Sequence, residues 1–312
     1  MSVTIRPMAE SDLDAVDRIN RLAFGTFFGL PDPPKFRGDG DGVRTRFRAG
    51  TASGVVAEDN GVVVGAGMGS VWGSFAVIGP VMVEPSRWGG GIAHAMTPAL
   101  VRHIEARGPR LLGLFTHPQS ASHIRLYEGV GFHPQTMHAC MAKPVAADRN
   151  GGEQVLYSTL DGPARASALS KCREICGASY PGLDVGGEIE AVRTLKLGDT
   201  VLLRRENDIA GFAVCHSGKG SECGSGAILA KLAFVRPGTG ATAELRALLQ
   251  CCEALGGQLG AQRFVACTNA ARGSYGVLKD YGFRAFMNGI VMMQRNDPGY
   301  HRPDVFALDD WR

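Results

Sequence analysis

The pattern of apolar and polar positions predicts a helix near the start of the chain, followed by a segment without regular structure. The helix begins near Ser11, after a short strand at Thr4-Ile5-Arg6, and its apolar residues recur every three or four positions on one face: Leu13, Val16, Ile19 and Ala23. Residues 24–42 contain prolines and a Gly/Asp run, which forbid a single regular element. We therefore expect a loop after the helix, with Phe24, Phe27 and Phe28 in it.

Strands dominate the next stretch. Asp59-Asn60-Gly61 interrupts an apolar run and predicts a hairpin. The elements expected after this hairpin are strands over 62–72 and 75–83, a glycine loop, a helix through Ala95 and Ile104, a strand over 111–116, a helix from Ser120 to Gly129 and a strand over 134–142. Residues 144–153 are expected to be a linker because they are rich in Gly, Pro, Asp and Asn.

The same order of elements returns after the linker. Val235-Arg236-Pro237 matches Val83-Glu84-Pro85 at an offset of 152, and Tyr281-Gly282-Phe283 matches Val130-Gly131-Phe132 at 151. A nearly constant offset favours an internal duplication, although two α/β halves that merely share a rhythm remain an alternative. The 312 residues also suit two domains. We expect domains at 1–146 and 154–296, and a C-terminal tail at 297–312.

Composition and charge exclude several classes of protein. Hydrophobic residues make up 45% of the chain, enough for a packed core, but no apolar run is long enough to span a membrane. The N-terminus lacks a basic segment followed by an apolar one, so we expect a cytoplasmic protein with no membrane partner. The net charge of +3 is too small to indicate nucleic acid. The eight cysteines form no paired C-x-x-C framework, which favours reduced thiols and no metal.

One glycine-rich turn carries candidate chemistry. Trp88-Gly89-Gly90-Gly91 joins the strand that ends at Val83 to the helix that begins near Ile92. Glycines let the backbone approach a ligand closely, and the N–H groups at a helix start attract anions, with a dipole contribution of about 0.3–1 kcal/mol. The turn therefore suits a pyrophosphate, although such turns also serve packing alone. It is not a P-loop, since no Gly-Lys-Ser/Thr follows.

A second motif gives this turn a context. Leu126-Tyr127-Glu128-Gly129-Val130-Gly131-Phe132, together with the loop Pro85…Gly91-Ile92-Ala93, resembles the GNAT superfamily of acyl-CoA N-acyltransferases. The resemblance covers residues 3–143 well and 155–294 more loosely. It implies an α/β fold of α+β mixed-sheet type with two tandem GNAT-like domains. Each domain would be a splayed mixed β-sheet flanked by helices, and the second copy would be degenerate.

The resemblance also implies an acyl-CoA site in the first copy, with acetyl-CoA as the donor and no metal. The pantetheine arm would pair with the backbone of one strand, and the pyrophosphate would lie on the glycine turn. Trp88 departs from the family pattern, which has Arg or Gln there, so the phosphate grip rests more on backbone N–H groups, with Arg87 and His94 as helpers. The residues assigned to this site are Val81, Met82, Val83, Arg87, Trp88, Gly89, Gly90, Gly91, Ile92, Ala93, His94 and Ser120.

The same resemblance places Tyr127 near the thioester sulfur, where it would protonate the leaving thiolate. A half-buried packing tyrosine beside Phe132 is the alternative. An amine of lysine type has a pKa near 10.4, so only about one molecule in a thousand is nucleophilic at pH 7.4 and a base is useful. His117 is the candidate base and Glu58 a weaker one, although loop histidines are commonly just solvated.

The acceptor site in this family borders the loop after the first helix. Phe24, Phe27, Phe28 and Asp32 would line it and suit a small cationic primary amine; a hydrophobic loop folded on the core is the other interpretation. The second copy has Leu278 in the position of Tyr127, and only Pro237-Gly238-Thr239-Gly240-Ala241 for the loop. We expect it to cover the first site in a pseudo-dimeric monomer that the tail straps together.

Three functions remain open at this stage. The first is an acetyl-CoA-dependent N-acetyltransferase that acts by direct attack of the amine, with its chemistry in the first copy. The second is a non-catalytic acyl-CoA-binding or sensor module, favoured by Trp88 and by the lack of an obvious carboxylate base. The third is an acyl-CoA enzyme of altered reaction type on the same fold, because a fold does not fix a function.

Overall fold

The computed structural model describes residues 3–146, 154–206 and 208–312, and therefore leaves most of the expected linker (147–153) outside the described residues. The first half contains the following elements: β1 (Thr4–Pro7), α1 (Leu13–Phe27), α2 (Gly42–Arg48), β2 (Ala52–Asp59), β3 (Val62–Trp72), β4 (Phe75–Val83), α3 (Ile92–Glu105), β5 (Leu111–Thr116), α4 (Ala121–Glu128) and β6 (Phe132–Pro144). Three expected strands, over 62–72, 75–83 and 111–116, are confirmed at both ends.

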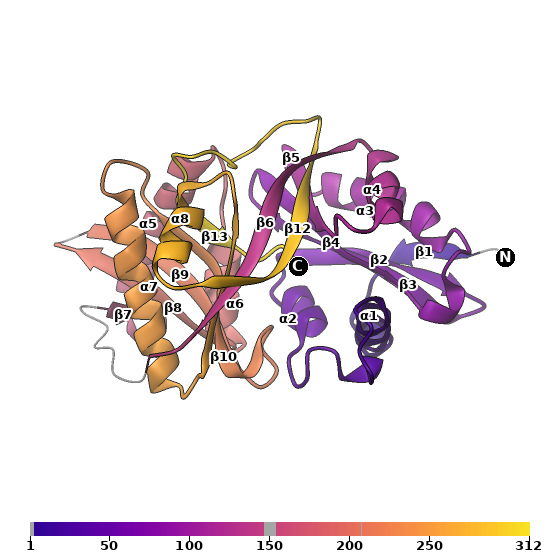
Figure 1. Cartoon of the computed structure of the whole chain (residues 1–312), viewed down its shortest axis with the longest axis horizontal. Helices are drawn as coiled ribbons and strands as arrows, with labels where there is room; N and C mark the ends of the chain where they lie inside the picture. The colour runs from indigo at the N-terminus through magenta and orange to yellow at the C-terminus, as the bar shows by residue number, and fades with distance from the viewer. Residues whose placement is uncertain (1–2, 147–153, 207) are drawn as a thin grey trace.

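The second half repeats this order (Figure 1). Its elements are β7 (Gln154–Leu156), α5 (Gly162–Ser179), α6 (Gly186–Thr194), β8 (Gly198–Arg205), β9 (Asp208–Gly218), β10 (Gly224–Val235), α7 (Ala241–Gln258), β11 (Arg263–Asn269), α8 (Gly273–Asp280) and β12 (Arg284–Gln294), followed by β13 (Ala307–Asp309) in the tail. The expectation of a mixed α/β fold with two tandem copies is confirmed.

The end of the first helix differs from the sequence-based expectation. Helix α1 continues through Phe27, so Phe24 and Phe27 lie on its last turns rather than in a loop. The prolines begin only at Pro31, too late to stop the helix earlier. Gly25 is needed inside it, because a Cβ there would lie 2.3 Å from the carbonyl oxygen of Pro33.

The strands of the first half are apolar on both sides because helices cover both faces of the sheet. Val55 and Ala57 of β2 pack in one hydrophobic cluster with α3, whereas Val56 between them packs in another with α1. Alternate side chains of a strand point to opposite faces, so both faces of the sheet are buried. The unbroken burial of β3 from Val63 to Ser70 has the same cause.

The two halves exchange their last strands. The sheet order is β1-β2-β3-β4-β5-β12-β6-β11-β10-β9-β8-β7, so β12 of the second half pairs with β5 of the first, and β6 pairs with β11. β6 and β12 pair with each other at the centre, where they run side by side between the halves (Figure 1). Each half of the sheet is therefore completed by a strand from the other.

A hydrophobic core and an ion network also join the halves. Trp72 and Phe75 of the first half share one buried cluster with Phe212 of the second half and Trp311 of the tail. Charged groups continue this interface: Arg46 pairs with Glu222 at 2.6 Å, and Lys231 pairs with Glu222 at 2.6 Å and with Glu188 at 2.8 Å. These side chains are buried, so removing one partner would leave an uncompensated charge at a cost of about 3–5 kcal/mol.

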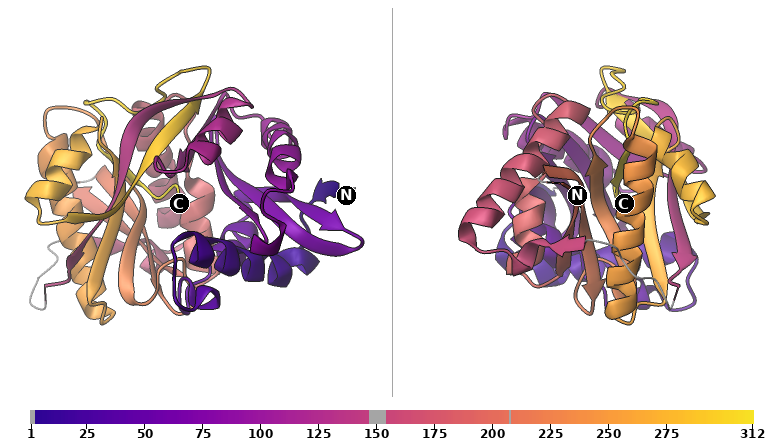
Figure 2. Two further views of the ribbon diagram at one scale, coloured as in Figure 1. Left: turned by 45° about the vertical axis from the view of Figure 1, so that its right-hand side comes forward. Right: turned by 90° about the vertical axis from the view of Figure 1, so that its left-hand side faces the viewer.

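The left view of Figure 2 shows the chain end in the middle of the molecule, between the two halves. The tail residues Leu308, Asp309 and Trp311 are buried. The Trp311 indole packs against Phe75, with ring centroids 5.5 Å apart, and against His138 at 5.8 Å. The tail thus contacts strands of the first half directly.

Candidate active site

Two parallel strands of the first half separate and leave a backbone edge open. β4 and β5 pair only from Phe75–Leu111 to Ile78–Leu114. A bulge on β4 follows at once, because residues 79 and 80 both lie opposite Met68 of β3. Beyond the bulge, β4 stays paired with β3 but diverges from β5. This is the splay that the resemblance implies.

The backbone of Val81 and Val83 faces this open side. The N–H of Glu84 donates to the carbonyl of Val64 on β3, so the neighbouring residue Val83 and, by alternation, Val81 point away from β3. The carbonyl of Val83 accepts a hydrogen bond from Nε1 of Trp88 at 2.8 Å. Trp88 therefore turns its indole N–H back to the strand edge, although the side chain remains 48% exposed.

The glycine turn presents unused donors. Gly91 caps α3 with φ +76°, a left-handed conformation that suits glycine, and a Cβ built on it would meet nothing within 4 Å. The N–H groups of Gly91, Ile92 and Ala93 make no hydrogen bond within the described part of the chain. A row of free N–H groups at a helix start beside open space fits a pyrophosphate.

The side chains assigned to this turn play unequal parts. The side chains of Met82 and Ile92 are buried, so these residues can offer only backbone groups, as can Gly89 and Gly90. His94 is exposed on the first turn of α3. Arg87 pairs with Asp59 at 3.0 Å, which holds its guanidinium towards the β2–β3 hairpin. Ser120 caps α4 by accepting a hydrogen bond from the N–H of His123.

Tyr127, on α4, packs in the hydrophobic cluster between the helices α3 and α4 and the sheet of the first half. Its ring is buried, 8% exposed, in the hydrophobic cluster that includes Ile78 and Leu114, the last paired residues of β4 and β5. Burial raises the pKa of its phenol, which stays protonated at neutral pH. The hydroxyl makes no hydrogen bond within the described residues, and its oxygen is not completely enclosed by protein. A protonated phenol without a hydrogen-bond partner in the described part of the chain is therefore present in this cluster.

The structure brings His117 together with the phenylalanines at the end of α1. The His117 ring lies 5.1 Å from that of Phe27 and 5.2 Å from that of Phe28, between ring centroids. His117 is 7% exposed, and burial lowers its pKa to about 4, with a further contribution from His123. The imidazole is therefore neutral at pH 7 and can accept a proton.

Within the described part of the chain, Asp32 pairs with a lysine rather than with a residue of this aromatic cluster. It is exposed and forms a 2.8 Å ion pair with Lys35, its neighbour one helical turn on. Phe24 contributes to the cluster indirectly, through its stacking on Phe28 at 6.3 Å. The weaker base candidate, Glu58, is held by Arg6 at 2.9 Å. The described contacts thus place imidazoles beside these phenylalanines, whereas the role of Asp32 stays a prediction.

His123 is the site residue that sequence reasoning missed. It stacks on Phe27, with ring centroids 5.2 Å apart, and burial lowers its pKa. It precedes Tyr127 by four positions on α4, so both side chains lie on one face of that helix. This spacing in the sequence could have revealed it.

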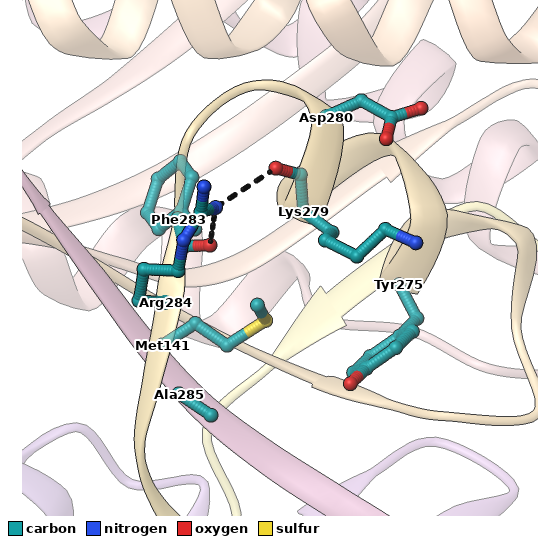
Figure 3. Close-up of a pocket in the computed structure, with 7 residues that line it drawn as sticks. All are labelled: Met141, Tyr275, Lys279, Asp280, Phe283, Arg284 and Ala285. Carbon is teal, nitrogen blue, oxygen red and sulfur yellow. Dashed lines mark hydrogen bonds between the residues drawn. The ribbon is translucent and has the colours of Figure 1, made fainter.

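A pocket of about 500 Å³ lies elsewhere, in the second half (Figure 3). Its residues come from α8, the start of β12 and Met141 of β6, and include none of the sequence-predicted site residues. The guanidinium of Arg284 is already used there, since it donates to the carbonyls of Lys279 and Phe283. Among the described residues, no group of His, Cys, Asp and Glu could hold a metal, and no helix is both long and apolar enough to cross a membrane.

Comparisons with solved structures support this fold assignment. The chain is similar to a putative acetyltransferase from Pyrococcus horikoshii, with 15% identity, a TM-score of 0.68 and coverage of 99% of this chain and 95% of that one. It is also similar to a GCN5-related N-acetyltransferase from Sphaerobacter thermophilus, with 16% identity, a TM-score of 0.60 and coverage of 95% of this chain and 96% of that one. A third similar structure is a tandem GNAT protein from the clavulanic acid biosynthesis pathway, with 14% identity, a TM-score of 0.58 and coverage of 94% of this chain and 98% of that one. At these identities the likeness concerns the fold.

Sequence comparison gives the family. No curated protein matches the chain. Residues 15–132 match the model of the acetyltransferase (GNAT) family, and this segment contains β4, the glycine turn, α3, β5 and Tyr127. Residues 15–132 therefore match the GNAT family, and the tandem arrangement of the whole chain is a likeness of fold to the solved structures above.

Proposed function

We propose that the first copy transfers an acetyl group from acetyl-CoA to the primary amine of a small molecule by direct attack. The observation that carries this proposal is the Tyr127 hydroxyl, which has no hydrogen-bond partner within the described residues and whose ring packs in the cluster that contains the last paired residues of β4 and β5. The free N–H groups of the glycine turn support binding of the donor's pyrophosphate. The exposed edge of Val81 and Val83 supports pairing with its pantetheine arm.

The reaction forms a C–N bond and breaks the C–S bond of the thioester. A backbone N–H on the open side of β4 would stabilise the oxyanion, and Tyr127 would give its proton to the departing thiolate. The proton released by the amine would pass to His117, directly or through water. With a pKa of about 4, His117 is a weak base, so the amine must already be neutral when it attacks.

The aromatic cluster favours such a neutral amine. The cluster presents apolar and uncharged surface from Phe27, Phe28, His117 and His123. An ammonium ion beside this surface would be disfavoured by desolvation. The acceptor would therefore carry its amine on an apolar or aromatic body. A polycation would lose more hydration energy there than these rings return.

One observation favours a second candidate, the non-catalytic acyl-CoA-binding module. Trp88 occupies the carbonyl of Val83, so a donor arm must displace its indole N–H or bond beside it. A protein that only senses acyl-CoA could use this displacement as its signal. The two candidates differ in turnover.

The test is thiol release from acetyl-CoA with a panel of primary amines that ranges from aromatic alkylamines to polyamines. Amine-dependent release, fastest with the apolar members, is expected. Binding of acetyl-CoA without release on any amine would favour the module, and release driven by a nucleophile other than an amine would indicate an altered reaction type. His117→Gln should lower kcat, whereas the exposed His133→Gln serves as its control.

A further inference from the structure

The second copy keeps the splayed strands of the first. The parallel ladder of β10 and β11 ends at Ala230–Ala266, and that of β4 and β5 ends at Ile78–Leu114, 152 positions earlier on both strands. A bulge follows the end of the ladder in both copies. On β10 it lies at Lys231, which has no partner in the register with β9; on β4 it follows Ile78. The second copy therefore has the same cleft between its two strands.

The tail of the chain fills this second cleft. β13 pairs antiparallel with Leu232–Phe234 of β10, directly after the ladder with β11 has ended. The pairing extends at both ends: the N–H of Val235 donates to the carbonyl of Phe306, and the N–H of Asp310 donates to the carbonyl of Lys231. An extended segment thus occupies the strand edge that is open in the first copy.

The opposite wall of the cleft binds the same segment. The carbonyl of Ala307 accepts hydrogen bonds from Oγ1 of Thr268 at 3.1 Å, Oγ of Ser274 at 2.9 Å and the guanidinium of Arg272 at 3.3 Å. Arg272 also pairs with the carboxylate of Asp309 at 2.7 Å, and both side chains are fully buried. These contacts fix the tail across the cleft from β10 to the end of β11.

The first copy has a matching hydroxyl without this occupant. Thr116 lies at the end of β5, 152 positions before Thr268 at the end of β11. Thr116 is buried as a residue, yet its hydroxyl makes no hydrogen bond within the described residues. The hydroxyl oxygen is also not completely enclosed by protein. The strand paired with β10 has no counterpart on β4 in the described part of the chain.

We infer that β13 is an intramolecular stand-in for the arm of an acyl donor. It closes the second cleft to any acyl-CoA, and its contacts identify Thr116 as a donor-binding residue of the first copy, where the hydroxyl bonds an amide carbonyl of the pantetheine arm. This inference rests on the proposed function, because it requires acyl-CoA in the first copy. The chain then binds one donor, not two.

Hydrogen exchange on the full chain tests the occupancy. Saturating coenzyme A should slow amide exchange in residues 79–93 and leave 228–241 and 305–311 unchanged, and a calorimetric titration should give one site per chain. Faster exchange in the tail, or two sites, would overturn the inference while leaving the proposed function intact. No binding of coenzyme A at all would overturn the proposed function, and the role of Thr116 with it.

A matched pair of variants tests Thr116. Thr116→Val should raise the Kd for coenzyme A about 2- to 10-fold, as expected for one lost hydrogen bond, and leave the Tm unchanged. Thr268→Val should leave that Kd unchanged and lower the Tm, because its hydroxyl binds the tail. Equal affinity of Thr116→Val and the native chain would refute the assignment, as would a weaker affinity in Thr268→Val.

Discussion

Replacing Tyr127 by phenylalanine removes one oxygen atom and little else. The ring stays in its hydrophobic cluster, and no hydrogen bond within the described part of the chain is lost. We therefore expect the free energy of unfolding to change by less than about 0.5 kcal/mol. The effect should appear in the chemical step, where loss of a positioned general acid lowers kcat by about 10²–10⁴-fold, or roughly 3–5 kcal/mol in the barrier.

The assay is thiol release from acetyl-CoA at saturating amine, with the Kd for acetyl-CoA measured in parallel. The Kd of Tyr127→Phe should match that of the native protein. Tyr281→Phe is the control, because this buried tyrosine of the second half donates to Glu253 and lies outside the proposed site. It should lose stability and keep its turnover. Native kcat in Tyr127→Phe would show that Tyr127 is only a packing residue.

Three further predictions concern the glycine turn, acid stability and the exchanged strands. Gly91→Val places a side chain where the pyrophosphate would lie, so its Kd for coenzyme A should rise at least about tenfold. Gly240→Val, at the equivalent cap of α7, should leave this Kd unchanged. An equal change of the Kd in both variants would contradict the site. His117, His138 and His216 have pKa values lowered to about 4, so the unfolded chain binds more protons than the folded one between about pH 6.5 and pH 4. Denaturant titrations should therefore show that the free energy of unfolding decreases as the pH is lowered through this range, by up to about 1.4 kcal/mol per pH unit for each histidine. A flat profile would refute this. A fragment of residues 1–146 lacks β12, so it should show no cooperative unfolding by circular dichroism until residues 154–312 are supplied; a fragment that folds alone would contradict the role of the exchange.

Local patterns in the sequence predicted the elements around the site well. The strands over 62–72, 75–83 and 111–116 follow from apolar runs between turn residues, and Asn60 and Gly61 adopt the positive φ that their hairpin requires. The glycine turn and Tyr127 could be found because their spacing is local. The bounds of the two domains remain a prediction, as does each residue's role at the site.

Long-range pairing could not be predicted from those patterns. β6 and β12 have similar apolar faces, and nothing in their composition says which of β5 and β11 each will join. β13 is only three residues long, too short for any periodicity, although its position decides what fills the second cleft. The pairing of Asp32 with Lys35, three positions later, was equally hard to foresee, and the role of Asp32 at an acceptor site stays a prediction.

The most direct test of an acyl-donor site in the first copy is a crystal structure of the full chain with coenzyme A. We predict the pyrophosphate against the N–H groups of residues 91–93, the pantetheine arm along Val81 and Val83, and the sulfur within hydrogen-bond reach of the Tyr127 hydroxyl. Coenzyme A bound between β10 and β11, or in the first copy with its sulfur remote from Tyr127, would contradict the account.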